Sequence, residues 1–298
     1  MFMQSGPSAK MRRYAWLYLM ILPVLVYFAL FVYWPLVQGV ISSFQETKLL
    51  GATTWVGTEN YREAVDTPQF WQVVRNTIII GGGIILLGFF PPILVALALN
   101  ELLSLTFKKV AQTTVYLPHL FSWVVIAGMW MYILAPSGGI VNETIKAFGG
   151  EPIRFFTSVG WARSLMIGLP IWRDMGYYAI IYLAAITSIS PSLYEAARVD
   201  GATRFQQTWQ ITLPMLKPTM LVVFMLNTLG MLRIFDQIFI MRNNVIKRQV
   251  DVLMTYVYDV GILQSKLGLA SAISVMVLGA TLVMTAFVWW VTGFGKEA

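Results

Sequence analysis

The sequence predicts an all-α integral membrane protein with six transmembrane helices. The first observation is composition: 57% of the 298 residues are apolar and 12% are charged, whereas soluble domains average about 45–50% and about 25%. The second is that the apolar residues gather in six long runs with polar connections between them. A water-soluble fold of this size cannot cover so much apolar surface, so lipid must be the solvent for much of the chain.

Composition also excludes several classes of function. The chain has no cysteine, which excludes disulfides, thiolate metal sites and cysteine nucleophiles. The net charge of +7 could suggest nucleic-acid binding, but the basic residues are scattered and lie mostly near the ends of apolar runs. That placement is typical of membrane anchoring, and we expect no nucleic-acid partner.

Six stretches are long enough to cross a bilayer, which takes about 20 apolar residues in a helix. The first follows a basic cluster, but its apolar run exceeds the roughly 7–15 residues of a signal-peptide core, so we interpret it as a retained span. Gly81-Gly82-Gly83 and Pro91-Pro92 in the second permit close helix approach and a bend. Residues 1–298 are predicted to form one transmembrane domain. The predicted spans are 14–42, 76–99, 113–135, 164–189, 218–241 and 271–294.

Six spans place both termini on one side of the membrane. Short connections rich in Lys and Arg favour the cytoplasm, and the two ends and the connections 100–112 and 190–217 have the greater density of them. The sequence therefore predicts cytoplasmic termini and outer connections at 44–75, 136–163 and 242–270. The basic residues concerned are Lys10, Arg12, Arg13, Lys108, Lys109, Arg198, Arg204, Lys217 and Lys296.

The connection 190–217 is predicted to form two short helices outside the membrane. Pro191 suits a first helical turn, Ser192 and Glu195 form an S-x-x-E capping pattern, and Gly201 can end the first helix in the left-handed conformation. A second helix over about 202–211 is expected to stop before Pro214. An amphipathic helix lying on the lipid surface explains the same pattern, so the residues alone leave both interpretations open.

The same connection carries a longer pattern of residues: Glu195-Ala196-Ala197, Asp200-Gly201-Ala202, Phe205, Ile211, Leu213-Pro214 and Pro218. It resembles the EAA loop of binding-protein-dependent ABC import permeases. The resemblance implies the type I importer permease fold, a first helix plus a five-helix core. It also implies that this loop is a coupling helix, in which Glu195, Ala196, Ala197, Asp200 and Gly201 transmit closure of a cytoplasmic ATPase.

Further motifs extend the resemblance over nearly the whole chain. Val56-Gly57, Asn60-Tyr61, Phe70-Trp71 and Asn76-Thr77 are similar to the first outer loop of carbohydrate-importer permeases. Other segments resemble permeases for fragments of complex plant polysaccharides in Gram-positive bacteria. Arg242-Asn243-Asn244-Val245 departs from the Thr-Gly-Gly-Pro turn of many sugar permeases, which disfavours simple disaccharides. The narrower matches are Tyr116-Leu117-Pro118-His119, Ser122-Trp123, Pro136-Ser137-Gly138-Gly139-Ile140-Val141-Asn142 and Phe235-Asp236-Gln237-Ile238-Phe239.

Polar residues inside two spans are candidates for a substrate pathway, because ionisable groups in a membrane usually face a cavity or a partner. Sugars need flat aromatic faces and polar groups for their hydroxyls. The alternative is structural: Arg173 and Asp174 lie near the outer interface, and Arg233 with Asp236, three apart on one helix face, form an internal tie. For His119, the only histidine, a structural hydrogen bond is expected. The candidates are Trp172, Arg173, Asp174, Tyr177, Tyr178, Asn227, Arg233, Asp236 and Gln237.

Two other functions compete with this interpretation. An ion-driven secondary transporter could use Asp174 or Asp236 as its proton carrier, but we find no internal repeat with matching broken helices. A membrane-embedded enzyme would need a catalytic motif such as H-E-x-x-H or G-x-S-x-G, and the chain has neither. It also lacks the G-x-x-x-x-G-K-[ST] phosphate loop, so an ATP-driven transporter requires a separate ATPase.

The resemblance therefore implies a permease subunit, not an enzyme, in a bacterial cytoplasmic membrane. We expect a second permease that is a different chain, two ATPase subunits that bind ATP and Mg²⁺, and an extracellular solute-binding protein that delivers an oligosaccharide. No cofactor or metal is expected on this chain, whose single histidine and lack of cysteine cannot make an ordinary zinc site.

Overall fold

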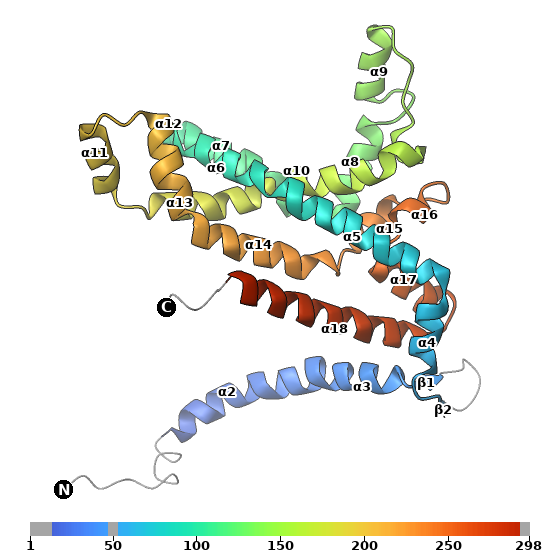
Figure 1. Cartoon of the computed structure of the whole chain (residues 1–298). Coiled ribbons are helices and arrows are strands. Elements are labelled where there is room, and N and C mark those ends of the chain that lie inside the picture. The colour runs from blue at the N-terminus through green and yellow to red at the C-terminus, as the bar shows by residue number, and fades with distance from the viewer. Residues whose placement is uncertain (1–13, 47–52, 293–298) are drawn as a thin grey trace, which may run out of the picture. The chain divides into compact units, whose positions relative to one another are not determined.

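The computed structural model describes residues 14–46 and 53–292, which are mostly helical (Figure 1). The predictions that involve Lys10, Arg12, Arg13 and Lys296 lie outside the described residues. The chain divides into two compact units, and α4 (Glu59–Asp66), η4 (Asp259–Leu263) and α18 (Leu267–Thr292) each continue from one into the other. The first unit is Met1–Ala64 with Val260–Val275, and the second is Val65–Asp259 with Met276–Ala298.

The first unit joins a long apolar helix to a small hairpin. The helix is continuous through α2 (Ala15–Phe28), η1 (Ala29–Tyr33) and α3 (Trp34–Ser42). Antiparallel strands β1 (Gln45–Glu46) and β2 (Thr54–Trp55) follow. The side chain of Asn60 donates to the carbonyls of Ser43 and Gln45 at 2.9 and 3.0 Å, which fixes the start of α4 against the end of α3.

The helix Trp16–Ser42 has almost entirely exposed apolar side chains; Trp16 and Met20, for example, are both 76% exposed. Water would be a poor solvent for so much contiguous apolar surface. Lipid or another protein chain must therefore cover it.

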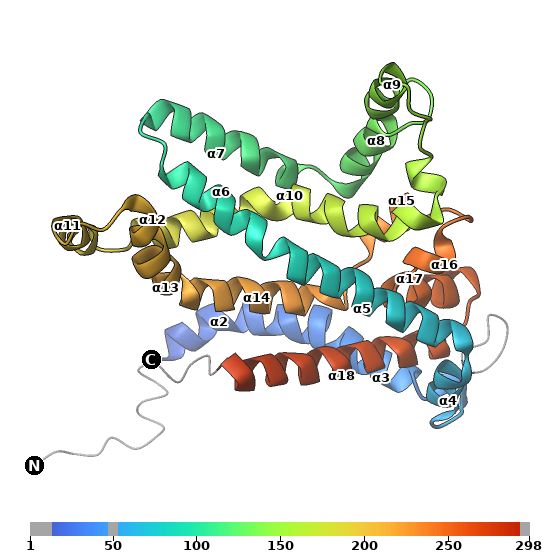
Figure 2. The same cartoon turned by 45° about the horizontal axis from the view of Figure 1, so that its top comes forward.

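The second unit is built around α10 (Val159–Thr187), which packs against α5 (Pro68–Gly88), α6 (Phe90–Asn100) and α7 (Leu105–Leu120) (Figure 2). Gly176 of α10 faces the backbone of Val115 on α7, and a Cβ at this position would overlap the Val115 carbonyl. The absence of a side chain at Gly176 is therefore what lets these two helices approach so closely.

The remaining elements of this unit are short or bent. Helix α9 follows α8 and begins at Ile140, and a 3₁₀ turn, η2, precedes α10. Figure 1 shows α9 beyond α8, at the top of the view. The bounds are α8 Trp123–Ile133, α9 Ile140–Ala147, η2 Phe155–Thr157, α11 Pro191–Val199, α12 Arg204–Gln207, η3 Thr208–Thr212, α13 Leu213–Met215, α14 Lys217–Met231, α15 Asp236–Met241, α16 Lys247–Val250 and α17 Leu253–Tyr258.

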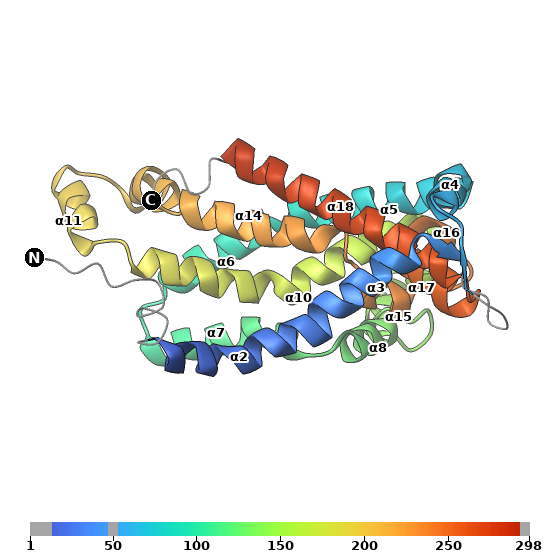
Figure 3. The same cartoon turned by 90° about the horizontal axis from the view of Figure 1, so that it is seen from below.

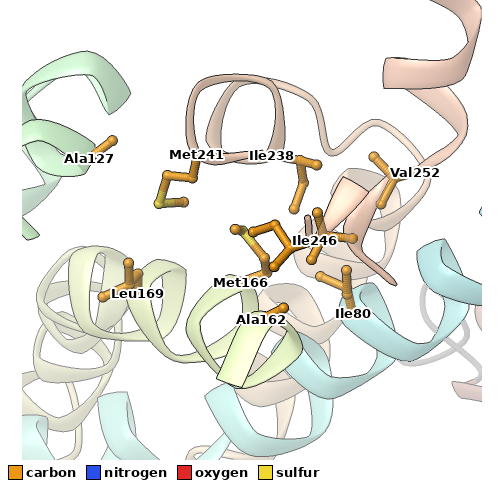
Figure 4. Packing of buried hydrophobic residues seen from close by; sticks show 10 residues of the cluster. Ile80, Ala127, Ala162, Met166, Leu169, Ile238, Met241, Ile246 and Val252 are labelled. Atoms are coloured by element: carbon orange, nitrogen blue, oxygen red, sulfur yellow. The ribbon is translucent and has the colours of Figure 1, made fainter. Parts of the chain in front are cut away.

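A buried apolar cluster joins α15, α16 and the segment after it to α5 and α10. Ile238 and Met241 of α15 point toward Met166 of α10, and Ile246 and Ile80 complete the contact (Figure 4). Side chains of Ile80, Met166, Ile238 and Ile246 are fully buried. The short α15–α16 segment is thereby fixed on the long helices although it is itself irregular.

Three described helices are long and apolar enough to cross a membrane singly: Trp16–Ser42, Pro68–Asn100 and Leu267–Trp290. Three further pairs pass the same test only when two bent helices are taken together. The described part of the chain thus has from three to six spans by length and composition. The pairs are Leu105–Leu120 with Trp123–Ile133, Val159–Thr187 with Pro191–Val199, and Arg204–Met215 with Lys217–Met231, bent by 101°, 68° and 58°.

The predicted span over 113–135 contains two helices rather than one continuous helix. Helix α7 ends at Leu120 and α8 begins at Trp123 after a turn of 101°. Pro118 removes a donor from the last turn of α7, and the Ser122 hydroxyl accepts from the Val125 N–H at 3.5 Å, which starts a new helix.

The helix in the predicted span over 218–241 is also interrupted. Helix α14 ends at Met231, just after Gly230, and α15 begins at Asp236. Phe235 between them has φ −140° and ψ −68°, outside the helical region. A glycine near the end of one helix and a carboxylate in the first turn of the next are both typical of such a break.

The predicted stop before Pro214 is wrong as well. The helix begins at Arg204, later than the expected 202, and continues through Pro214 to Met215. A π-helical turn, η3, immediately precedes this proline. The wider turn relaxes the usual clash between a proline ring and the carbonyl four residues earlier, so the helix ends one residue after the proline rather than before it.

Candidate functional site

The connection between α10 and α14 forms a hairpin of two short helices that lies beyond the ends of α10 and α14 (Figure 3). Helix α11 starts at Pro191 and is followed by Gly201, whose φ is +80°. The N–H groups of Gly201 and Ala202 donate to the carbonyls of Arg198 and Ala197 at 3.1 and 2.8 Å. This is the hydrogen-bond pattern of a Schellman helix end, so the left-handed turn predicted at Gly201 is confirmed.

The predicted S-x-x-E cap of this helix is wrong. Ser190, not Ser192, is the N-cap residue, and Ser192 lies in the first turn with its hydroxyl 2.8 Å from that of Ser190. A proline prefers the first helical position, so Pro191 places the cap one residue before itself. The capping box belongs to the next helix, where Thr203 and Gln206 bond reciprocally.

The hairpin presents apolar side chains to the outside. Leu193, Val199 and Phe205 are 45%, 88% and 75% exposed. Its base is held by a hydrogen bond of 2.9 Å between the hydroxyls of Tyr194 and Thr212. Glu195, Ala196 and Asp200 are exposed and Ala197 is half-buried, so the small side chains and both carboxylates are available to another molecule.

On α10, the candidate residues Arg173 and Asp174 lie against the bend between α7 and α8. The Arg173 guanidinium donates to the carbonyls of His119 and Phe121 at 3.1 and 3.3 Å and to Asp174 Oδ1 at 2.9 Å. It also lies 4.9 Å from the ring centroid of Trp123. Arg173 thus supplies donors to carbonyls that the helix break leaves without helical partners. Its contacts favour a structural role at the bend.

His119 forms the structural hydrogen bond expected for it, and its partner is Asp174. The His119 Nδ1 lies 2.8 Å from Asp174 Oδ1, and the ring stacks on Tyr177 with centroids 4.4 Å apart and an interplanar angle of 14°. Tyr177 in turn meets Tyr178 edge to face at 5.1 Å. The sequence did not predict that this histidine would join the candidate residues, because 55 positions separate it from Asp174.

The other candidate on α10, Trp172, meets Trp130 of α8 edge to face at 5.3 Å. Asn227 of α14 reaches α10 from another side: it lines one small cavity together with Asp174 and Tyr178. Five predicted residues from two helices are therefore brought together here, namely Arg173, Asp174, Tyr177, Tyr178 and Asn227.

Arg233, Asp236 and Gln237 lie at the break between α14 and α15. Arg233 and Asp236 do not share the predicted helix face, because Arg233 lies in the turn after α14 and Asp236 begins α15. In the described part of the chain no ion pair joins Arg233 to Asp236, and both are exposed. Gln237 is buried, with 7% of its surface exposed. The internal tie considered for the charged pair is therefore wrong.

Aromatic side chains that the sequence did not single out accompany this break. Phe235 stacks on Phe239 with centroids 5.0 Å apart, and Tyr258 of α17 meets Phe239 edge to face at 4.8 Å. The motif around Phe235 was identified in the sequence, but Tyr258 lies 19 residues beyond Phe239 in the predicted connection 242–270. Only the fold brings it there.

A buried ion cluster follows α15, outside the candidate spans. Arg242 donates to Asp251 at 2.8 Å and to both carboxylate oxygens of Asp259 at 2.7 and 3.1 Å, and Lys247 lies 2.7 Å from Asp259. Only 10%, 5% and 6% of the Arg242, Asp251 and Asp259 side chains are exposed. This cluster closes the segment 242–259 on itself.

The charges in this cluster determine its pKa directions. Burial raises the pKa of Asp251. Burial acts the same way on Asp259, but hydrogen bonds from Arg242 and Lys247 outweigh it, so the pKa of Asp259 is lowered. For Arg242, burial is outweighed by the two carboxylates, which raise its pKa further.

No group of three or more His, Asp or Glu side chains in the described ranges is arranged to hold a metal ion. The polar groups at α10 and at the α14–α15 break are instead hydroxyl, amide, carboxylate and guanidinium groups next to aromatic rings. Such an arrangement suits hydrogen bonding and ring stacking with a polar solute.

Known proteins are similar to this chain in both sequence and fold. The polygalacturonan/rhamnogalacturonan transport system permease protein YteP of Bacillus subtilis (strain 168) is 39% identical over 285 residues, 93% of this chain and 88% of YteP. Protein LplB of the same strain is 33% identical over 284 residues, 93% of this chain and 89% of LplB. A solved chain of a bacterial alginate ABC transporter, in complex with an alginate pentasaccharide-bound periplasmic protein, matches with a TM-score of 0.89 and 33% identity, covering 95% of this chain and 96% of that one.

The family match gives the same result. Residues 92–292 match the family described as binding-protein-dependent transport system inner membrane component. The matched region includes α11, the pathway candidates on α10 and α14, and the ion cluster. The chain belongs to this family of ABC transporter permeases and is a transport subunit, not an enzyme.

Proposed function

We propose that this chain is the membrane-spanning permease of an ATP-driven importer for oligosaccharides derived from plant polysaccharides. The observation that carries the proposal is the α11 hairpin, an exposed element at the ends of α10 and α14. The substrate class is supported by relatives named for transport of polygalacturonan/rhamnogalacturonan and of alginate. Alginate is an acidic polysaccharide, so we include charged as well as neutral oligosaccharides among the candidate substrates.

The α11 hairpin would couple ATP binding to transport. Ala196 and Ala197 allow a close helix approach, and Glu195 and Asp200 provide polar contacts to a partner surface. Gly201 fixes the turn that connects α11 to α12 and α14. Because the chain has no phosphate loop of its own, a cytoplasmic ATPase would bind ATP and Mg²⁺ and move this hairpin.

The assembly we propose has this permease beside a second, different permease, two ATPase subunits and an extracellular solute-binding protein. A solved relative was crystallised with a substrate-bound periplasmic protein, which supports the last of these partners. We place the chain in the bacterial plasma membrane as one domain of six spans with cytoplasmic termini, in the type I importer arrangement of a first helix and a five-helix core. The three bent helix pairs would then each count as one span.

The substrate pathway is proposed to follow α10 and the break after α14. Trp172, Tyr177 and Tyr178 offer aromatic faces, and Asn227, Arg233, Asp236 and Gln237 offer groups for sugar hydroxyls or carboxylates. At the break, the aromatic faces come from Phe235 and Phe239. Arg173 and Asp174 would support this surface by holding the α7–α8 bend.

An ion-driven transporter that uses Asp174 or Asp236 is the alternative. Asp174 contacts both His119 and Arg173 at the α7–α8 bend, which favours a structural role for it over that of a proton carrier. Reconstituted vesicles distinguish the two mechanisms. We expect oligosaccharide uptake to require ATP and the binding protein and to survive collapse of the proton gradient. Uptake that follows the gradient and ignores ATP would contradict the proposal.

A further inference from the structure

A cavity of about 20 Å³ lies where the α5–α6 junction, α10 and α14 meet. Its polar side chains are those of Asp174, Tyr178 and Asn227, and Gly88, Pro92 and Pro170 also line it. All three elements belong to the second unit. A polar cavity among helices that cross lipid needs an explanation, because unsatisfied polar groups are costly there.

The three polar side chains retain unused hydrogen-bonding capacity. The bonds that Asp174 accepts from His119 and Arg173 both go to Oδ1, which leaves Oδ2 as a further acceptor. The Asn227 amide nitrogen donates to the Val223 carbonyl at 2.9 Å, which leaves its oxygen. The Tyr178 hydroxyl is already hydrogen-bonded to the Asn227 side chain, and because a hydroxyl can both donate and accept, its O–H can still donate.

The backbone adds one more acceptor. Pro92 has no N–H and so cannot donate to the Gly88 carbonyl four residues earlier, as the corresponding residue of a regular helix does. Gly88 is the last residue of α5 and lines the cavity. Pro92 therefore leaves the Gly88 carbonyl without its helical donor, in the lining of the same cavity as Asp174, Tyr178 and Asn227.

Volume and charge determine what this site binds. Roughly 10–15 Å³ of such space is enough for one water molecule, which needs two to four polar partners. A cation is disfavoured because Arg173 and His119 already face the Asp174 carboxylate. We propose that the cavity binds one water molecule, which accepts from the Tyr178 hydroxyl and donates to Asp174 Oδ2 and to the Gly88 carbonyl or the Asn227 oxygen.

This water joins three membrane helices at one point. It adds to the direct hydrogen bond between Tyr178 of α10 and Asn227 of α14 and extends that contact to the α5–α6 junction. Such a bridge lets α14 shift against α10 and exchange one hydrogen bond at a time, so no bare polar group enters the apolar layer during the movement.

Radiolytic footprinting of the purified full-length protein tests the proposal, because hydroxyl radicals formed from a bound water oxidise the side chain next to it. Met175 also lines the cavity and is the reporter. Met166, fully buried on the same helix, is the internal reference. We expect X-ray exposure to convert Met175 to its sulfoxide and to leave Met166 intact.

Variants distinguish the bound water from water that reaches Met175 elsewhere. Asn227→Leu fills the cavity and should lower Met175 oxidation to the level of Met166, and Tyr178→Phe, which keeps the ring, should lower it in part. Thr228→Val is the matched control: Thr228 is the neighbouring buried residue on α14 and bonds to the Phe224 carbonyl instead. Intact Met166 in every variant shows that the fold is retained.

Two results would overturn the proposal. If Met175 in the unaltered protein is oxidised no more than Met166, no water is bound in this cavity. The same conclusion follows if Asn227→Leu leaves the oxidation of Met175 unchanged. Oxidation that rises when sodium is replaced by choline means that a cation occupies the site instead.

Discussion

Replacing Arg242 by methionine tests whether the ion cluster after α15 is as closed as its geometry indicates. The cluster contains two cations, Arg242 and Lys247, and two carboxylates, Asp251 and Asp259, so it is neutral. Without Arg242, two carboxylates that are 5% and 6% exposed face only Lys247, which is 40% exposed. Removing one partner from a buried ion pair typically costs about 3–5 kcal/mol, because a buried charge is left uncompensated.

That free energy corresponds to a fall of about 10 °C in the midpoint of thermal unfolding for a domain of this size. The eleven tryptophans make intrinsic fluorescence of the detergent-solubilised protein a direct measurement. Arg204→Met is the matched control, because Arg204 pairs with Glu101 at 2.6 Å but the two side chains are 79% and 54% exposed. An exposed pair contributes at most about 1 kcal/mol, so this variant should shift the midpoint little.

A second substitution separates the charge effect from lost packing. Adding Asp259→Asn to Arg242→Met leaves one carboxylate facing one lysine, so part of the lost stability should return. A midpoint for Arg242→Met that falls no further than for Arg204→Met would refute the reasoning. If the double variant regains none of the lost stability, packing rather than charge stabilises this segment.

Three further substitutions give shorter tests. Because the pKa of Asp259 is lowered from 3.8, its carboxylate contributes stability above that pH and loses it as the pH falls through the lower folded-state pKa. The difference between the unfolding midpoints of the unaltered protein and Asp259→Asn should therefore be largest at about pH 6 and should disappear as the pH falls below 3.8. A difference that does not change with pH contradicts this. Gly176→Ala places a Cβ on the Val115 carbonyl and should cost about 1–3 kcal/mol, whereas Gly168→Ala, with open space around it on the same helix, should be neutral or stabilising; equal effects would exclude the close approach. Gly201→Ala strains a residue at φ +80° by about 1–2 kcal/mol and should speed hydrogen exchange at the end of α11 roughly tenfold; unchanged protection there would mean that the turn does not depend on glycine.

Local chemistry predicted the α11 hairpin well from the sequence. Proline at the start and glycine after the end of a helix constrain the backbone by themselves, so Pro191 and Gly201 marked the helix before any tertiary contact was known. The S-x-x-E cap failed for the same reason, since a cap at Ser192 is incompatible with a helix that already begins at Pro191.

Patterns that assume an uninterrupted helix predicted less well. The spacing of Arg233 and Asp236 implied one face only if the helix continued, and the break after Met231 removed that premise. Hydropathy reports only whether a stretch is apolar, so it could not distinguish a straight span from the 101° bend between α7 and α8.

Contacts between distant residues were beyond the sequence altogether. His119 meets Asp174 because α7 and α10 cross at Gly176, and Arg242 meets Asp259 because the segment between them folds back. A single sequence does not determine which opposite charges pair.

The α11 hairpin is the central element of the proposed mechanism, and crosslinking tests its role most directly. The chain has no cysteine, so one cysteine at the exposed Ala196 gives a single reactive site. A cysteine at the exposed Glu151, in a connection we place outside the cell, is the control. Both positions are treated with a short bifunctional crosslinker in native membranes, after labelling has shown that each is accessible.

We predict that the cysteine at position 196 captures an ATPase subunit, that Gly201→Ala weakens this capture, and that the cysteine at position 151 captures no ATPase. Capture of lipid alone at position 196, with the protein intact and the site labelled, would contradict the account. It would show that α11 lies on the membrane surface and does not receive the force of ATP binding.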